Sequence, residues 1–185
     1  MTALLEPKIM TQIAFLEMEH DGLFEFVNGE IVEKNMGAIS MEIGNVILFI
    51  LRTYCYEHKL GRVMMEQFFQ CYSDDPERVR RPDVAFISKG KLPGDKLPEG
   101  AISVVPDLVV EVVSPYDKQY KVDEKVKEYL DAGVRIVWVV SPPGQYVRIY
   151  RNGRPTTELS IADTITGEDV IAGFSCKVSE FFATI

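Results

Sequence analysis

A single carboxylate stands inside an apolar segment of this sequence. Glu111 lies within Leu108–Val113, a run rich in β-branched residues that is typical of a buried strand. Because side chains alternate along a strand, Asp107, Val109 and Val113 are expected on the same face as Glu111. An ionised carboxylate in an apolar sheet is costly unless its charge is compensated. We therefore expect a cation, a metal ion or a water-filled cleft on that face.

A second carboxylate, Asp83, follows Pro82 at the start of another apolar segment, residues 84–87. If the two segments are neighbouring strands, Asp83 and Glu111 present the hard oxygen ligands that Mg²⁺ prefers, and the carbonyl of Val112 can add another. A metal held in this way activates a water molecule and neutralises a phosphate, so the pattern indicates metal-assisted phosphodiester hydrolysis. Two alternatives remain open: Asp83 as a turn residue, and Glu111 as the ion-pair partner of an arginine.

Hydrolysis of this kind also uses a lysine that stabilises the attacking hydroxide or the transition state. Val113, two residues after the buried glutamate, cannot supply that group. The helix expected over residues 115–132 carries Lys118 and Lys125 on the flank of its buried stripe, beside Tyr129, from where a long side chain can reach the sheet. The alternative for either lysine is a solvated helix face.

Three arginines precede the candidate aspartate, at Arg78, Arg80 and Arg81. Guanidinium groups bind phosphate oxygens in pairs, so Arg80 or Arg81 is a candidate contact for a nucleic-acid backbone. The alternative is a loop whose positive charges offset an acidic surface.

The elements that position these residues follow from hydrophobic periodicity and turn residues. The dipeptide Asn28-Gly29 predicts a β-hairpin whose glutamates, including Glu25, lie on a solvated face. Further predictions are helices over 8–18, 39–58 and 115–132, the last capped by Ser114, and strands over 62–72, 84–87, 107–113, 135–140, 145–151, 156–159, 169–171 and from 174 onward. This order predicts an α+β or mixed-sheet fold.

Bulk composition suits one globular domain over residues 1–185, with 46% hydrophobic and 26% charged residues. A net charge of −8 argues against strong non-specific DNA binding. It is compatible with a metal-dependent enzyme, because a local basic patch can exist in an acidic protein. No run of about 18 apolar residues and no signal sequence is found, and the three cysteines are odd in number and far apart, so we expect a cytoplasmic protein without membrane contact.

Five phrases spread over most of the chain resemble a known family. They are FEFVNGEIVE (24–33), VRRPDVAFIS (79–88), PDLVVEVVSP (106–115), KVKEYLDAGVRIVWVVSP (125–142) and AGFSCKVSEFF (172–182). In this order they resemble the Uma-type family of restriction-endonuclease-like proteins, within the PD-(D/E)XK nuclease superfamily. The resemblance implies an α/β restriction-endonuclease-like core, with a central mixed sheet flanked by helices, an N-terminal β-hairpin and C-terminal antiparallel strands.

The resemblance also implies a site and an activity. Asp83 and Glu111 would bind Mg²⁺, for which Mn²⁺ can substitute, and the lysine role would have moved from Val113 to Lys125. The superfamily often carries an acidic residue on its first helix, where Glu42 is the nearest candidate, and other members carry a histidine near Ser40. The candidate supporting residues are therefore Ser40, Glu42, Arg81, Lys118 and Tyr129.

Two functions from different classes are carried forward from the sequence. The leading hypothesis is a metal-dependent endonuclease acting on DNA, and the alternative is a catalytically inactive nuclease-fold protein that binds a nucleic acid or a protein. A homodimer is expected for cleavage of both strands, with an exposed strand or the C-terminal residues Phe174, Phe181 and Phe182 as the candidate contact surface.

Overall fold

A six-stranded mixed sheet forms the centre of the protein, and the computed structural model describes residues 10–34, 36–115 and 117–185. Its strand order is β3-β4-β5-β6-β7-β8, in which β5 and β6 run parallel and every other neighbouring pair is antiparallel. The strands are β3 (Gly61–Met65), β4 (Val84–Ser88), β5 (Leu108–Val112), β6 (Ile136–Ser141), β7 (Tyr146–Tyr150) and β8 (Thr157–Ser160).

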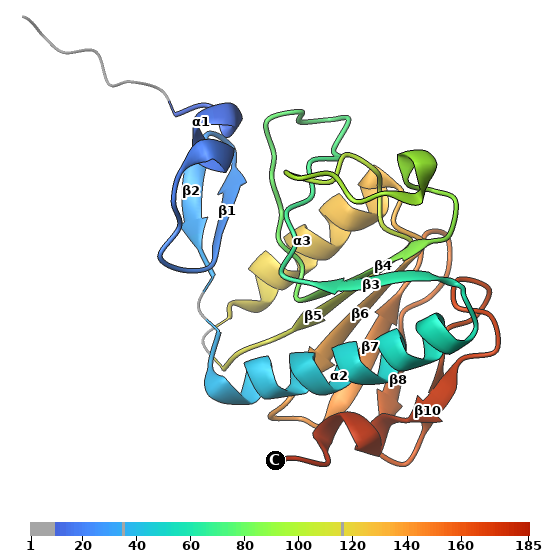
Figure 1. Cartoon of the computed structure of the whole chain (residues 1–185). Helices are drawn as coiled ribbons and strands as arrows, with labels where there is room; N and C mark the ends of the chain where they lie inside the picture. Colours follow the sequence, from blue (N-terminus) through green and yellow to red (C-terminus); the bar gives the residue numbers. More distant parts are fainter. Residues whose placement is uncertain (1–9, 35, 116) are drawn as a thin grey trace, which may run out of the picture.

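One face of the sheet is covered by helix α2 (Ala38–Glu57), together with the C-terminal strands β9 (Thr164–Thr166) and β10 (Ser175–Lys177) and the 3₁₀ helix η2 (Val178–Phe182) (Figure 1). The buried stripe of α2 recurs at a spacing of four residues, at Ile43, Ile47, Leu51 and Cys55. Each large apolar side chain buried in this way contributes about 1.5–3 kcal/mol. By length and mean hydropathy, 1.3 over its most apolar window, α2 also resembles a membrane span, but its inner stripe packs on the sheet as in a core helix.

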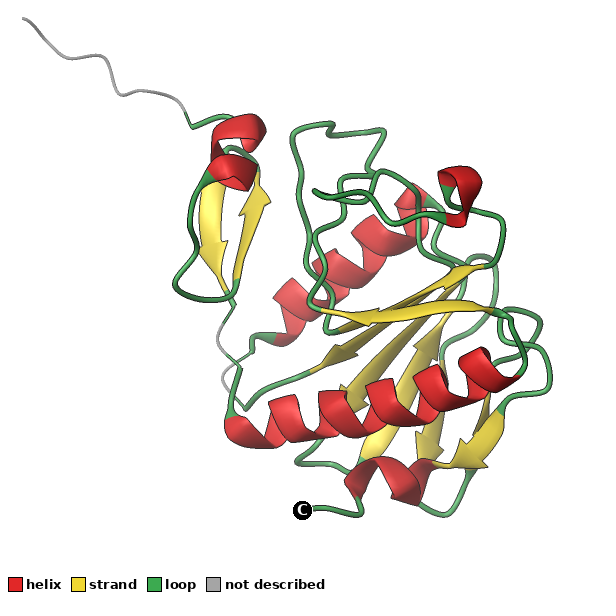
Figure 2. Cartoon of the chain, viewed as in Figure 1, coloured by secondary structure: helices red, strands yellow, loops and turns green. Residues whose placement is uncertain are grey.

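Helix α3 (Gln119–Ala132) covers the opposite face, between the parallel strands β5 and β6 in the chain (Figure 2). Val126 and Tyr129 pack there against Val109 and two valines of β6. Gly133 ends α3 in the left-handed region, with φ of 102°, as the sequence predicts. Odd-numbered residues of β5 therefore face α3, which places Glu111 on the side of that helix.

The N-terminal hairpin packs beside this core as a separate layer (Figure 1). It comprises α1 (Gln12–Glu17), β1 (Phe24–Val27) and β2 (Glu30–Glu33), and Asn28 and Gly29 form its turn with positive φ angles. Phe26 exchanges two backbone hydrogen bonds with Val79, of 2.9 and 2.7 Å, and both side chains join Phe15 in a small apolar cluster. The hairpin is thus joined to the segment that leads into β4.

Several predicted boundaries are wrong. Helix α3 begins at Gln119, because the Asp117 side chain accepts a hydrogen bond from the Ser114 amide at 2.7 Å and closes a turn before the helix. The strand predicted over 62–72 ends at Met65, and 169–171 is a turn, whereas β9 and β10 lie on either side of it. Residues 8 and 9 of the predicted first helix, and Tyr116, lie outside the described residues.

The sequence suggested that the aromatic residues of the C-terminal tail form an exposed contact surface, and this expectation is wrong. Phe174, Phe181 and Phe182 are buried against α2 and the sheet. Large apolar side chains are exposed on α2 instead, where Phe49 is 71% and Tyr56 is 84% exposed.

Candidate active site

Asp83 directly precedes β4, and Glu111 lies on the neighbouring strand β5. In the antiparallel pair of β4 and β5, the register ends with Val84 opposite Val110, one residue from each acid. The side chain of Asp83 accepts a hydrogen bond from the amide of Val112, the residue after Glu111. The structure therefore brings together the two acids that the sequence predicted to be neighbours.

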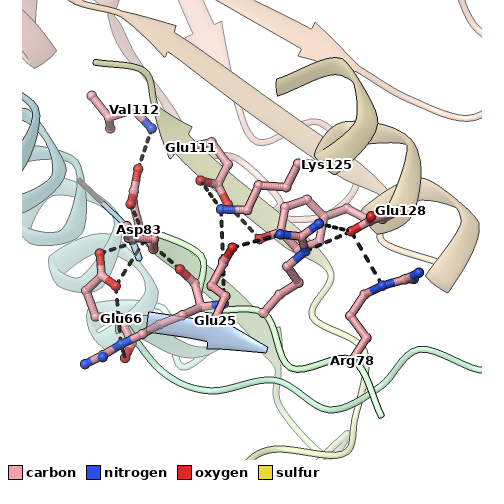
Figure 3. A network of polar contacts seen from close by, with 12 residues as sticks. Glu25, Glu66, Arg78, Asp83, Glu111, Val112, Lys125 and Glu128 are labelled. Atoms are coloured by element: carbon pink, nitrogen blue, oxygen red, sulfur yellow. Dashed lines mark hydrogen bonds and ion pairs between the residues drawn. The ribbon is translucent and has the colours of Figure 1, made fainter. Parts of the chain in front are cut away.

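Both carboxylate oxygens of Asp83 accept short hydrogen bonds, and the residue is only 2% exposed (Figure 3). Oδ2 accepts from the backbone amide of Val112 at 2.6 Å, which binds the start of β4 to the end of β5. Oδ1 lies 2.6 Å from Nζ of Lys34. Asp83 therefore lies buried where β4 begins, with both carboxylate oxygens bonded within the chain.

Glu111 is compensated by groups on helix α3. Its Oε2 lies 3.0 Å from Nζ of Lys125, and its Oε1 accepts a 2.6 Å hydrogen bond from the hydroxyl of Tyr129. Burial raises the pKa of Glu111, Lys125 opposes the shift, and the nearby charge of Asp83 reinforces it. The sequence left open an ion pair between Glu111 and an arginine. In the structure the ion-pair partner of Glu111 is Lys125.

The structure adds a glutamate that sequence analysis assigned to solvent. Glu25 on β1 is 2% exposed, and its Oε1 lies 3.0 Å from Nζ of Lys125 while its Oε2 lies 2.8 Å from Nη1 of Arg80. Burial acts to raise the pKa of Glu25, but Lys125 and Arg80 outweigh it and lower the pKa to about 2. The alternation of polar and apolar residues along β1 predicted a solvent-exposed face for Glu25. In the structure that face is covered by α3 and by the segment before β4.

Lys34 is the second group that the sequence did not single out. It follows β2 directly, and its ammonium contacts Asp83, both carboxylate oxygens of Glu66 at 3.0 and 3.1 Å, and the carbonyl of Arg81 at 2.6 Å. Burial acts to lower the pKa of Lys34, but the surrounding carboxylates raise it. In the sequence Lys34 is a single lysine after a predicted hairpin, and this pattern matches no motif that would mark it as a functional residue.

The arginines before β4 hold the hairpin to the core. Arg80 joins Glu25 of the hairpin to Glu128 of α3 and is buried. Arg81 donates from Nε to the carbonyl of Glu66 at 2.7 Å, and its guanidinium lies over the ring of Phe68. The burial of Arg80 does not fit the expected contact with a nucleic-acid backbone, so we assign it a structural role.

Most of these groups line one cavity of about 500 Å³, whereas Glu66, Arg81 and Tyr129 lie behind its lining. Its walls are the hairpin, the end of β5 and the N-terminal turns of α3. Its lining includes Asp83, Glu111 and Lys125. Lys118 and Lys121 lie on the same lining and are exposed. The cavity thus has carboxylates at its base and lysines along α3.

Two predicted supporting residues lie elsewhere. Glu42 is exposed on α2, and the cavity is lined by other residues. Ser40 is buried in the first turn of α2, and its hydroxyl is 3.4 Å from the carbonyl oxygen of Val113. Ser40 therefore contacts the residue after β5 but is not part of the cavity lining.

The donor set around Asp83 fits a hard divalent cation. Carboxylate oxygens of Asp83, Glu111 and Glu66 are the ligands that Mg²⁺ and Mn²⁺ prefer, and one cation, the Lys34 ammonium, already lies among four oxygen atoms. Among the described residues, no group of three or more His, Cys, Asp or Glu side chains is arranged as a ready-made metal site. The chemistry of the donors fits, and a metal requires these side chains to exchange partners.

Comparisons with known proteins agree with this architecture. The sequence profile of the Uma2 family, described as "Putative restriction endonuclease", matches residues 12–179. A solved structure, described as "a putative nuclease belonging to DUF820" from Anabaena variabilis, superposes with a TM-score of 0.79 at 19% sequence identity and covers 94% of this chain and 98% of its own. No curated protein matches the chain.

Proposed function

The chain belongs to the Uma2 family, and from this premise and the geometry of its cavity we propose that it is a Mg²⁺-dependent endonuclease that hydrolyses phosphodiester bonds of DNA. Mn²⁺ would substitute for Mg²⁺, since both take oxygen ligands. One observation carries the proposal: two buried carboxylates, one directly before β4 and one on β5, line one cavity that is also lined by lysines.

Each group at the base of the cavity has a proposed role. Asp83 and Glu111, with the carbonyl of Val112, would hold the metal, which when bound would supply an activated water and neutralise charge on the phosphate. Lys125 lies against Glu111 and stabilises the attacking hydroxide or the scissile phosphate. Tyr129 donates to Glu111 and fixes the orientation of its carboxylate.

The exposed lysines of the cavity are proposed to contact the DNA backbone. Lys118 and Lys121 lie near the start of α3, on the rim of the cavity. Their ammonium groups offer contacts for phosphate oxygens beside the carboxylates of Asp117 and Glu124. The buried Arg80 is not among these contacts.

Replacement of Asp83 tests the catalytic proposal. Cleavage of plasmid and single-stranded DNA with Mg²⁺ or Mn²⁺ is compared for the wild type, Asp83→Ala and Asp83→Asn. We expect both variants to lose more than about 100-fold in rate, because loss of a group that merely supports a metal ligand already costs roughly 10–100-fold. Asp123→Asn, an exposed aspartate on α3, is the control. Equal cleavage by wild type and both Asp83 variants would reject the assignment.

The alternative is a non-catalytic binding module with the same fold. It is favoured by the fact that each of the four carboxylate oxygens of Asp83 and Glu111 already has a hydrogen-bond or ion-pair partner within the chain. Calorimetric titration separates the two functions. Absence of Mg²⁺ or Mn²⁺ binding at millimolar metal would favour the binding module.

We also propose that two copies of the chain act together as a homodimer. A duplex has two strands and the proposed site is built within one chain, so symmetric cleavage needs a second copy. The apolar side chains exposed on α2, notably Phe49 and Tyr56, are the contact surface we assign. Sedimentation velocity of the purified chain should show a dimer that Phe49→Glu dissociates. A wild-type monomer at tens of micromolar would contradict this.

A further inference from the structure

The ammonium of Lys34 has the surroundings of a bound metal ion. Its four oxygen neighbours lie at 2.6 to 3.1 Å and comprise one oxygen of Asp83, both oxygens of Glu66 and the main-chain carbonyl of Arg81. Three carboxylate oxygens and a carbonyl are also the donor types of Mg²⁺ and Mn²⁺ sites. The lysine side chain is only 10% exposed, so its charge depends on these four atoms for solvation.

Lys34 and Lys125 each bridge two buried acids at or beside the cavity. Lys34 bridges Glu66 and Asp83, whereas Lys125 bridges Glu25 and Glu111. A divalent ion shared by Asp83 and Glu111 needs an oxygen of Asp83, and the free edge of that carboxylate is held by Lys34. An ammonium and a divalent cation in contact with the same oxygen repel each other strongly, so the two exclude one another.

We propose that Lys34 is a built-in competitor of the metal: its ammonium occupies the cation position beside Asp83 and leaves when a divalent cation binds. The inference rests on the proposed function, because it concerns the same metal position. It assigns the hairpin a regulatory role, since the residue that follows β2 sets the metal concentration at which the site loads. The apparent metal affinity equals the intrinsic affinity multiplied by the fraction of molecules in which Lys34 has left the position.

Lys34 can leave without rearrangement of the fold. All four residues of β2 are exposed, so no buried apolar contact of that strand depends on the position of the Lys34 side chain. Lys34 also lines the cavity of about 500 Å³, and rotation of its four-carbon stem can move the ammonium toward solvent there. The backbone amide of Lys34 keeps its 2.7 Å hydrogen bond to the carbonyl of Leu23 during such a rotation.

Metal affinity of charge-matched variants is the first test. Mn²⁺ binding is measured by calorimetry for the wild type, Lys34→Gln, Lys34→Met, Lys125→Gln and the exposed Lys121→Gln. We expect both Lys34 variants to bind Mn²⁺ about tenfold tighter or more, because a like charge in direct contact is removed. Lys125→Gln frees Glu111 and not Asp83, so it measures the gain at the other proposed ligand. Lys121→Gln removes the same charge from the same cavity without freeing either carboxylate. An equal gain in Lys121→Gln, or no gain in either Lys34 variant, would overturn the proposal.

Acylation of lysines in the wild-type chain is the second test, and it requires no variant to fold. An amine-reactive ester is applied with and without Mg²⁺, and modification at each lysine is read by mass spectrometry. We expect modification of Lys34 to rise several-fold when Mg²⁺ is added, while that of Lys121 stays constant. If calorimetry shows Mg²⁺ binding and Lys34 stays protected, the proposal fails and the metal-dependent function stands. If no variant binds metal at millimolar concentration, both fail.

Discussion

The two halves of the cavity are built in different ways. In the sheet–helix half, Glu111 of β5 is paired with Lys125 and Tyr129 of α3, which lie 14 and 18 residues further along the chain. In the hairpin half, Lys34 reaches Asp83 across 49 residues and Glu25 reaches Arg80 across 55. The first half is positioned by one strand–helix unit. The second depends on the docking of a separate layer.

This difference indicates how each half responds to change. The sheet–helix half is held by buried apolar packing on both faces of the sheet. The hairpin half is held by the small apolar cluster of Phe15, Phe26 and Val79 and by the ion pairs around Arg80. We therefore expect substitutions at ion pairs of the hairpin to alter docking, and with it the metal position, while the sheet remains folded.

Loss of Arg80 should have the largest effect on stability. Arg80→Met leaves Glu25 and Glu128 without their shared guanidinium, and breaking a buried pair costs about 3–5 kcal/mol. The free energy of unfolding is measured by urea denaturation. Arg148→Met, which breaks the exposed pair with Glu158, is the matched control and should cost about 0–1 kcal/mol. Equal losses in the two variants would show that the ion pairs around Arg80 do not hold the hairpin.

A smaller effect is expected in the dependence of stability on pH. Burial raises the pKa of Glu66 from 4.5 to about 7. The charges of Asp83 and Glu111 add to this shift, and the charge of Lys34 opposes it. The folded chain then binds more protons than the unfolded chain between these values, so the contribution of Glu66 is fully present below about pH 4.5 and is lost as pH rises through about 7. Urea denaturation at pH 5 and pH 8 measures this decline.

Glu66→Gln should remove that decline, because the amide does not titrate. Glu124→Gln, an exposed glutamate on α3, is the control and should keep the wild-type dependence. The same decline in Glu66→Gln would contradict the account. At acid pH the sign reverses for Glu25: its pKa is lowered to about 2, so its contribution is lost as pH falls from about 4.5 toward 2.

The same difference between the halves explains what could be predicted from the sequence. The sequence singles out Glu111 because a charge inside a β-branched run is costly without a partner, and Lys125 because helical periodicity places it beside Tyr129. The structure shows these three side chains in contact. The central mixed sheet and the Asn28-Gly29 turn were likewise predicted from local patterns and are confirmed. Such signals lie within one element or between consecutive elements.

The hairpin half had no comparable local signal. Glu25 alternates with apolar residues as a solvated residue of a surface strand does, and only docking against α3 and Arg80 makes it buried. Lys34 is one lysine among many, and its role depends on Asp83 being close in space. The start of α3 was misplaced for a related reason, because the sequence pattern of a helix cap also closes the turn between Ser114 and Asp117.

The central claim, that Asp83 and Glu111 jointly hold a divalent cation, is tested most directly by crystals of the wild-type chain soaked in Mn²⁺. Anomalous scattering locates the metal without reference to activity. We predict a peak at about 2.1 Å from oxygen atoms of both carboxylates, with the Lys34 ammonium moved away from Asp83. An empty site at millimolar Mn²⁺, with Lys34 still in contact with Asp83, would contradict the account.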